Sequence, residues 1–149
     1  MKVEEIMKKE VIAIKKGTSY QEVAEILIKN KISGAPVVDD KGDIVGVVSE
    51  KDLFRAIYPD YKDFYETPAA HLDFEKLEEE AKRAGDKKVE EFMSKRLITA
   101  DPDTPVLKIG ALMIATGIHR VPVVKDKKVV GMVSRRDIYK AILKERFNL

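Results

Sequence analysis

The hydrophobic pattern of the chain is clearest near its C-terminus, in two short valine-rich runs separated by a charged turn. The runs are Val121–Val124 and Val129–Val133. β-Branched residues dominate both runs and the break between them is polar, which predicts a β-hairpin. Neither run alternates apolar with polar residues, so we expect both faces of these strands to be buried. A Ser-x-x-Asp sequence follows, and Ser134 is expected to cap a helix that begins at Arg135.

The same pattern occurs earlier in the chain. Gly117–Asp137 reads GIHRVPVVKDKKVVGMVSRRD, and Lys31–Asp52 reads KISGAPVVDDKGDIVGVVSEKD. The match extends upstream, where Glu5-Ile6-Met7 corresponds to Glu91-Phe92-Met93 and Thr18 corresponds to Thr104. An internal repeat of this kind overrides other cues when a fold is predicted.

Each copy predicts a β-α-β-β-α unit. The elements expected in the first copy are a strand at Val11–Ile14, a helix over 19–30, hairpin strands at Ala35–Val38 and Ile44–Val48, and a helix at Lys51–Ile57. The second copy should have a strand at Leu97–Thr99, a helix with Pro105 at its first position, the valine-rich hairpin and a helix over 135–146. Thr18 and Thr104 precede the first helix of each copy, and capping of that helix is one interpretation of both.

The segment between the copies belongs to neither. It is rich in aromatic residues and proline at its start, and it then predicts an acidic helix at Phe74–Arg83, ended by Gly85. We therefore expect a first repeat over residues 1–57, a connector with one helix over 58–88, and a second repeat over 89–149.

The two-sided apolar strands predict how the repeats combine. The two helices of a unit can cover only one face of its small sheet, so the other face needs a partner. The predicted fold is therefore of the α/β (α+β) class, with two repeats packed sheet to sheet about a pseudo-twofold axis. Clefts lined by equivalent loops should lie between them.

Composition narrows the class of protein. The chain has 149 residues, is 44% hydrophobic, contains no cysteine and has only two histidines. It can form one compact domain, but disulfide, cysteine-ligand and histidine-rich metal chemistry is unavailable within one chain. No apolar stretch is long enough to be a signal sequence or to span a bilayer, which favours a cytoplasmic protein. The high charge content and scarcity of Asn and Gln suggest a thermophilic source.

Charge is distributed unevenly along the chain. The first repeat has 10 basic and 10 acidic residues, the connector 6 and 9, and the second repeat 12 and 7. The basic second repeat suits an anionic ligand. Its excess of positive charge is modest for a nucleic-acid-binding protein.

The two ordered sets of residues resemble a tandem pair of cystathionine-β-synthase (CBS) domains, a Bateman module, in a stand-alone protein of the prokaryotic or archaeal type. The motifs that carry the resemblance are Ile32–Val38, Gly46–Leu53, Gly117–Val124 and Gly131–Ile138. The resemblance implies a regulatory pair that binds adenine nucleotides (AMP, ADP or ATP) or S-adenosylmethionine in the clefts. It also implies a homodimer, often disc-like, and no required cofactor.

The predicted ribose contacts are Asp52 and Asp137. Each lies three residues after a serine, Ser49 or Ser134. A carboxylate accepts hydrogen bonds from both hydroxyls of a ribose diol, and the resemblance gives this role to both residues. The alternative is that each serine caps a helix and each aspartate lies at its third position, where the helix dipole favours a carboxylate. The two interpretations are compatible.

Phosphate contacts are expected mainly in the second repeat. Arg120 offers a rigid fork of donors, and the resemblance to energy-sensing CBS proteins implies phosphate contact for His119 and Arg120. The first repeat has the uncharged Ser33-Gly34 at this place, so the cleft reached by Arg120 should hold phosphate better. Further candidates at the helix starts are Ser49, Ser134, Arg135 and Arg136. For Arg135 and Arg136 the alternative is an ordinary solvated face.

The adenine ring is expected to meet the strand entries. The resemblance places Thr18 and Thr104 in contact with the nucleotide. Backbone groups and an apolar wall for adenine would come from four residues: Ala35, Pro36, Val121 and Pro122. Simple strand entry is the alternative for these four.

These observations favour a ligand-sensing module over an enzyme. The sequence has no phosphate-binding G-x-x-x-x-G-K-[ST] motif, no metal-ligating cluster and no nucleophile–base pair, so we predict no catalytic and no metal-binding residues. Two alternatives stay open. The basic second repeat could bind nucleic acid, or the pair could be a purely structural dimerisation module.

Overall fold

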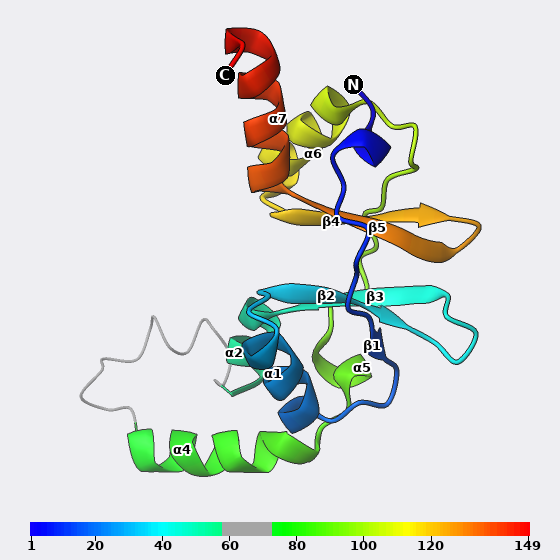
Figure 1. The fold of residues 1–149 in the computed structure, drawn as a ribbon. Coiled ribbons are helices and arrows are strands. Elements are labelled where there is room, and N and C mark those ends of the chain that lie inside the picture. The colour runs from blue at the N-terminus through cyan, green and yellow to red at the C-terminus, as the bar shows by residue number, and fades with distance from the viewer. Residues whose placement is uncertain (58–72) are drawn as a thin grey trace. The chain divides into compact units, whose positions relative to one another are not determined.

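A computed structural model describes residues 1–57 and 73–149, which form a mixed α/β structure (Figure 1). By contacts the chain divides into two compact units. Unit 1 consists of Met1–Ile12, Lys41–Ile44 and Leu97–Leu149, and unit 2 of Ala13–Asp40 and Val45–Arg96. The aromatic start of the predicted connector, residues 58–72, lies outside the described residues.

Unit 2 holds most of the first repeat. Its sheet has the order β1 (Ile14–Lys15), β2 (Gly34–Val38), β3 (Ile44–Ser49), with β1 parallel to β2. The helices α1 (Tyr20–Lys29) and α2 (Glu50–Ile57) lie on the same side of this sheet (Figure 1). The Tyr20 hydroxyl donates a hydrogen bond to the Leu53 carbonyl at 2.7 Å, which ties α1 to α2, and burial raises the pKa of Tyr20.

The connector contributes its helix to unit 2. The predicted acidic helix is confirmed as α4 (Phe74–Arg83), and the one-turn helix η3 (Ala84–Asp86) follows it where Gly85 was expected to end it. The short helix α5 (Val89–Phe92) comes next.

Unit 1 holds most of the second repeat. Its hairpin pairs β4 (Arg120–Lys125) with β5 (Lys128–Ser134), and the register shifts between Val123 and Val124. The helices α6 (Val106–Thr116) and α7 (Arg135–Phe147) lie on one side of the hairpin (Figure 1). Three consecutive strand residues, Val121 to Val123, are buried. Successive side chains of a strand point to opposite faces, so both faces are covered, as predicted.

Two of the strands differ from the prediction. The first begins only at Ile14 and continues to Lys15, so Val11–Ile14 was placed too early. The strand predicted at Leu97–Thr99 was wrong. Only Ala100 pairs with the hairpin there, through a parallel bridge to Val123. A single bridge is too short a ladder to count as a strand, although Ala100 still exchanges backbone hydrogen bonds of 3.0 and 2.8 Å with Pro122 and Val124.

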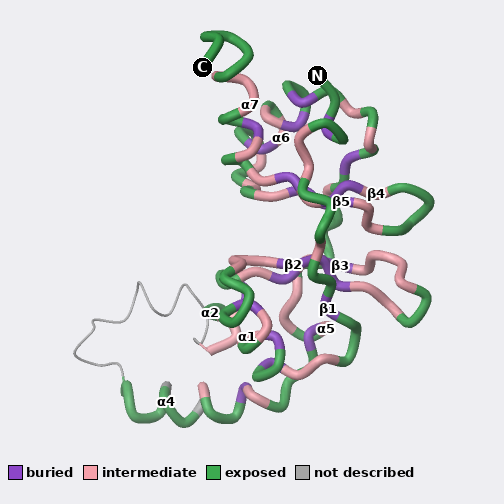
Figure 2. Tube along the Cα trace, in the orientation of Figure 1, coloured by how far each residue is buried: buried purple, intermediate pink, exposed green. Residues whose placement is uncertain are grey.

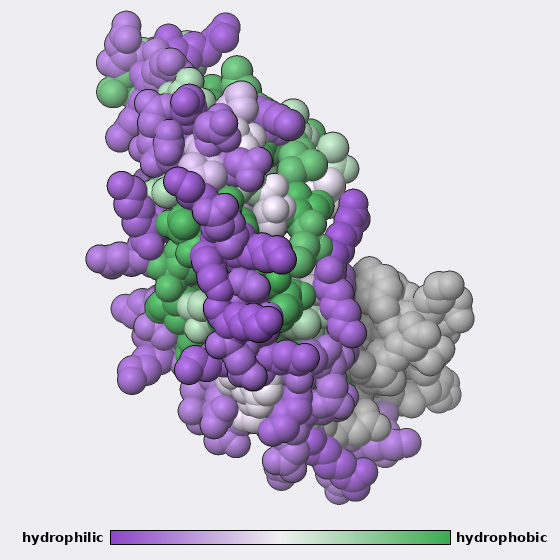
Figure 3. Space-filling model, turned by 90° about the vertical axis from the view of Figure 1, so that its right-hand side faces the viewer, coloured by the Kyte–Doolittle hydropathy of each residue, from purple (hydrophilic) through white to green (hydrophobic). Residues whose placement is uncertain are grey.

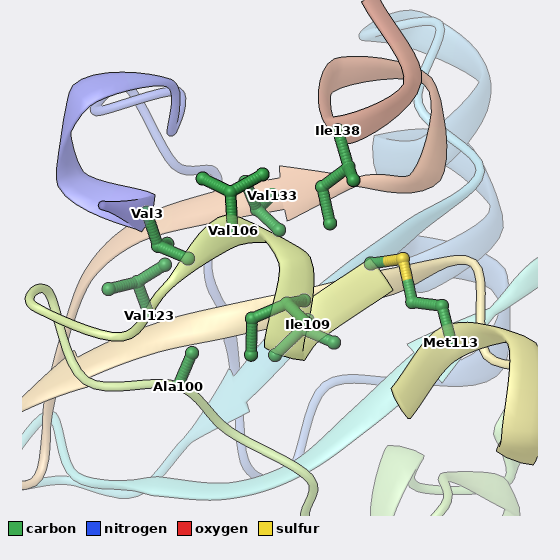
Figure 4. Close-up of a cluster of buried hydrophobic side chains, with 9 residues drawn as sticks. Val3, Ala100, Val106, Ile109, Met113, Val123, Val133 and Ile138 are labelled. Carbon is green, nitrogen blue, oxygen red and sulfur yellow. The ribbon is translucent and has the colours of Figure 1, made fainter. Parts of the chain in front are cut away.

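Each unit has its own apolar core. The core of unit 1 is shown in Figure 4, where side chains from the hairpin, α6 and α7 converge with Val3 from the one-turn helix η1 (Val3–Glu5). The core of unit 2 contains Val23, Val37 and Val48, together with Val89 from α5. The buried parts of the trace in Figure 2 follow these strands and inner helix faces, whereas hydrophilic side chains cover much of the face seen in Figure 3.

These cores do not follow the repeats along the chain. Val3 belongs to the first repeat but packs in the core of unit 1, and Val89 belongs to the second repeat but packs in the core of unit 2. The segment that begins each repeat therefore completes the core formed mainly by the other one. The repeats predicted from sequence, with boundaries at 57 and 89, differ from the compact units for this reason.

The exchanged segments make equivalent hydrogen bonds. The Val3 N–H donates to the Thr104 carbonyl at 2.9 Å, and the Val89 N–H donates to the Thr18 carbonyl at 2.8 Å. Further along, each segment forms a two-bond antiparallel bridge to the last hairpin strand. The bridges join Lys8 to Met132 and Ser94 to Val47, with N···O distances of 2.9 to 3.0 Å. Both units therefore hold their exchanged segment through the same hydrogen-bonding pattern.

Glycine makes the close approach of these segments possible. A Cβ on Gly46 would lie 2.6 Å from Met93 Sδ, and a Cβ on Gly131 would collide with Met7. Gly46 and Gly131 are equivalent positions, as are Met93 and Met7.

The tip of the first hairpin is held in unit 1 by an ion pair. Lys128 Nζ lies 2.6 Å from Asp43 Oδ1 and also donates to the Lys41 carbonyl. The hydrogen bond from Lys128 to the Asp43 carboxylate lowers the pKa of Asp43 below its ordinary value, and the charges of the nearby lysines add to this effect. The pair is solvent-accessible, so we expect its contribution to stability to be small and salt-dependent.

The exchange can be tested by adding a single methyl group at Gly131. Gly131→Ala should lower the free energy of unfolding by about 1–3 kcal/mol, because the new methyl displaces Met7 and strains the bridge at Lys8. Chemical denaturation would measure this, with Gly85→Ala as the control because nothing lies within 4 Å of a Cβ there. Met7→Ala shortens the side chain that the new methyl meets, so the double variant Gly131→Ala with Met7→Ala should recover part of the lost free energy of unfolding. If the effects of the two substitutions simply add, the contact is contradicted.

Candidate functional site

The predicted ribose and phosphate contacts lie at the open end of each hairpin, where the second strand ends and a helix begins. In unit 1 the register places Arg120 directly opposite Ser134. The Arg135 N–H donates to the His119 carbonyl at 2.8 Å, which fixes the first turn of α7 beside the entry of β4. The strand entry and the helix start are therefore one local structure.

Ser134 and Asp137 form a closed pair at the start of α7. Asp137 Oδ2 accepts from the Ser134 N–H at 2.9 Å and from its hydroxyl at 2.7 Å. The Asp137 N–H donates back to Ser134 Oγ at 3.1 Å, so Ser134 caps α7 as predicted. Ile138, the next residue, points into the core (Figure 4), which anchors this turn.

The second carboxylate oxygen of Asp137 is left for other partners. Among the described residues, no hydrogen bond to Asp137 Oδ1 is present, and no buried side-chain oxygen there lacks a partner. Oδ1 therefore reaches solvent while Oδ2 fixes its direction. A carboxylate held in this way can accept hydrogen bonds from a diol.

Unit 2 repeats the arrangement. Asp52 Oδ2 accepts from the Ser49 N–H at 2.9 Å and from its hydroxyl at 3.1 Å. The Glu50 N–H donates to the Ser33 carbonyl at 3.0 Å, the counterpart of the bond between Arg135 and His119. Asp52 is only 9% exposed, which makes it the charged residue with the deepest burial in the described part of the chain.

The capping interpretation of Thr18 and Thr104 was wrong. The cap of α1 is Ser19, which forms a capping box with Glu22, and the cap of α6 is Pro105. Thr18 instead donates its hydroxyl to the Lys15 carbonyl at 2.6 Å, and Thr104 Oγ1 accepts from the Asp101 N–H at 3.0 Å. Each threonine closes the turn before the helix, because the chain reaches helical geometry one residue later than predicted.

The predicted adenine wall is buried in the strands. Pro36 and Pro122 are less than 2% exposed, and Ala35 and Val121 belong to the two cores. Their side chains serve packing, which leaves backbone groups as the part that could meet a ligand. The contact with adenine stays a prediction.

Three of the predicted phosphate contacts are exposed. His119, Arg135 and Arg136 are exposed, and Arg120 is half-buried. One residue of the corresponding first-repeat structure was not among the predicted site residues. Glu50 lies where the second repeat has Arg135, and the aligned repeats carried that signal.

A pocket of about 320 Å³ lies elsewhere in unit 1. It is lined by residues of the α6 start and the far end of α7, with Val106, Ile142 and Arg146 among them. Asp137 lies at the opposite end of α7, so this pocket is separate from the predicted site. Within the described residues, no helix is long and apolar enough to cross a membrane, and no cluster of three or more potential metal ligands is present.

Comparison with known proteins places the repeats in a family. The CBS domain family matches residues 3–59 and 89–144. The chain belongs to the CBS domain family. Both CBS matches begin at the exchanged segments, so each CBS repeat in sequence includes the part that packs in the other unit.

The chain is similar to several archaeal proteins. The uncharacterized protein MJ1426 of Methanocaldococcus jannaschii is 33% identical over 96% of this chain and 92% of its own length. Three further relatives are longer. The chain spans 42% of MJ1225 and 22% of the L-aspartate semialdehyde sulfurtransferase, both of M. jannaschii. It spans 24% of the homoserine O-acetyltransferase of Methanohalobium evestigatum. In these three, the similarity covers less than half of the protein.

Solved structures show the same fold. The CBS domain pair of protein MJ0100, crystallised with 5′-methylthioadenosine and S-adenosyl-L-methionine, aligns with a TM-score of 0.74 at 30% identity, covering 97% of this chain and 98% of that one. CBSX2, known from Arabidopsis thaliana, has a structure in complex with AMP that aligns with a TM-score of 0.73 at 28% identity, covering 97% and 98%.

Removing the hydroxyl of Ser134 should loosen the helix start. We expect Ser134→Ala to lower the free energy of unfolding by about 1 kcal/mol, because it removes the cap of α7 and one bond to Asp137. Urea denaturation would measure the change. Ser94→Ala is the matched control, since Ser94 is exposed and pairs through its backbone. The capping role would be contradicted if Ser134→Ala, like Ser134→Thr, had the same free energy of unfolding as the native chain.

Proposed function

We propose that this chain is a non-catalytic regulatory module that binds an adenosine nucleotide or S-adenosylmethionine, with one site at each Ser-x-x-Asp turn. The observation that carries the proposal is the serine-held aspartate, which occurs in the same geometry in both units. A carboxylate with one fixed and one accessible oxygen suits the two hydroxyls of a ribose.

The comparisons support an adenosine-bearing ligand. The MJ0100 domain pair was crystallised with 5′-methylthioadenosine and S-adenosyl-L-methionine, and CBSX2 with AMP. These compounds share an adenosine group and differ at the 5′ position. Recognition through the ribose accounts for both kinds of ligand.

We assign the ribose to Asp52 and Asp137 and the phosphates mainly to the second repeat. Arg120 enters β4 opposite Ser134, and Arg135 and Arg136 lie in the first turn of α7. Guanidinium donors near a helix start favour a phosphate through their charge, and the positive end of the helix dipole adds to this attraction. The remaining proposed contacts are made by two threonines, Thr18 and Thr104, and by the backbone at Ala35 and Val121.

Binding would act by stabilising one arrangement of the chain. A ligand at a hundredfold excess over its dissociation constant adds about 2.7 kcal/mol to the stability of the state that binds it. A regulated partner responds if it prefers that state. We expect such a module to act in the cytoplasm, where adenosine nucleotides are available, and the charge-rich composition supports a thermophilic source.

A sensing role also agrees with the partial matches to enzymes. The chain aligns with 22% of a sulfurtransferase and 24% of an acetyltransferase, so the similarity is confined to a minor part of each protein. This supports a regulatory and non-catalytic module.

Asp137 provides the main test of the proposal. In a thermal-shift panel with AMP, ADP, ATP, S-adenosylmethionine and 5′-methylthioadenosine, at least one adenosine compound should raise the melting temperature of the native protein. Asp137→Ala should reduce the shift caused by phosphorylated compounds, whereas Asp86→Ala, which changes an exposed carboxylate outside the site, should not.

An oligonucleotide in the same panel tests the basic second repeat as a nucleic-acid site. Such binding would weaken steeply with salt and would not depend on Asp137. If no adenosine compound shifts the midpoint, the proposed function fails and a structural dimerisation role gains support.

We further propose that the chain forms a homodimer through its helices. On α6, Leu107 and Ile114 are 70% and 87% exposed and lie seven residues apart, on the same face as Ala111. The repeats expose matching residues, Ile28 for Ile114 and Phe54 for Tyr139. A second copy related by a twofold axis would present the same residues in return, as closed dimers do.

The dimer can be tested at Ile114. Sedimentation should show a dimer for the native chain and a shift toward monomer for Ile114→Glu, because a buried carboxylate opposes apolar packing. Lys108→Glu on the same helix is the control for added negative charge. A monomeric native chain, or an unchanged dimer in Ile114→Glu, would contradict this interface.

A further inference from the structure

The two proposed sites share one backbone geometry but carry opposite charge at the same place. Residue N1 of the helix is Glu50 in α2 and Arg135 in α7. Each donates its backbone N–H to the strand entry, at 3.0 Å to Ser33 and at 2.8 Å to His119. The aspartate two residues later is held by its serine in both. The side chain at N1 is therefore placed equivalently relative to each proposed ribose contact.

Neighbouring residues extend this difference. The first turn of α2 contains two acids and one base, Glu50, Lys51 and Asp52, and that of α7 contains two bases and one acid. The strand entry beside it is Ser33-Gly34 in the first repeat and His119-Arg120 in the second. Every position that changes its charge between the sites makes the first one less positive.

Burial strengthens the effect in the first site. Asp52 is 9% exposed, and no hydrogen bond to its Oδ1 is present among the described residues, where no buried side-chain oxygen lacks a partner. This carboxylate is thus nearly buried, yet one oxygen remains accessible. A phosphate brought near this turn would face two negative groups, the nearly buried Asp52 carboxylate and the exposed Glu50 carboxylate, whereas a neutral or cationic group would not be repelled.

We propose that the site of the first repeat selects adenosine ligands whose 5′ group is uncharged or cationic, a thioether or a sulfonium, and that Glu50 is the residue that excludes phosphate. The second site takes the phosphorylated nucleotides. This inference rests on the proposed function and adds ligand class to it. One chain would then report two kinds of adenosine compound through separate sites.

Single-site variants allow each site to be measured alone. Asp137→Ala leaves the first site intact, and Asp52→Ala leaves the second. In isothermal titration, Asp137→Ala should bind 5′-methylthioadenosine at least tenfold more tightly than AMP. Asp52→Ala should show the opposite order. Both variants are first checked for native circular dichroism and cooperative melting, because Asp52 is nearly buried.

The role of Glu50 is tested in the Asp137→Ala background. Glu50→Gln should raise AMP affinity, and Glu50→Arg should raise it further, by roughly tenfold over the starting variant, because repulsion becomes attraction. The gain should shrink as salt increases. Affinity for the uncharged 5′-methylthioadenosine should change by less than threefold. Glu79→Arg on α4 makes the same charge reversal at an exposed position and should leave the AMP affinity unchanged.

The outcomes separate this inference from the proposed function. If the native chain binds no adenosine compound, the proposed function itself fails. If it binds them but Asp137→Ala prefers AMP, or if Glu50→Gln and Glu50→Arg leave the ratio of AMP to 5′-methylthioadenosine affinity unchanged, charge selection by Glu50 is overturned. If Glu50 only supports the start of α2, Glu50→Arg would lower the melting temperature but leave the ratio of AMP to 5′-methylthioadenosine affinity unchanged.

Discussion

The fold depends on each repeat receiving the hydrophobic segment that begins the other one. Val3 fills the core formed by the second hairpin and its helices, and Val89 fills the core of the first. The backbone bridges at Lys8 and Ser94 then add to the hairpins. Because neither compact unit is a continuous piece of chain, neither repeat can complete its core from its own residues alone.

This constraint also positions the proposed ligand sites. The hairpins are held from one side by their own helices, and at Gly46 and Gly131 by the exchanged methionines. The final residue of each hairpin is the serine that begins the next helix and holds the aspartate three residues later. Packing in the core therefore fixes the direction of the aspartate carboxylate in each turn, without a ligand being needed to order it.

The duplication left the frame of the two sites alike and let their charges diverge. Hydrogen bonds of 2.8 and 3.0 Å tie the helix start to the strand entry in the two copies, while N1 is Arg135 in one and Glu50 in the other. Side chains at N1 are exposed, so they can change without cost to the core. Because the two turns share their backbone geometry and differ in surface charge, a repeated unit of this kind is suited to binding two classes of ligand.

The sequence by itself determined the repeat, the hairpins and the Ser-x-x-Asp turns, because these depend on contacts between residues close in the chain. It also contained the contrast between Glu50 and Arg135. Only the tertiary structure decided that Val3 and Val89 pack in the opposite units, since an apolar lead-in has the same pattern whichever core it fills. The turn-closing role of Thr18, in place of capping, was likewise decided there, because a shift of one residue in the helix start leaves the local sequence signal almost unchanged.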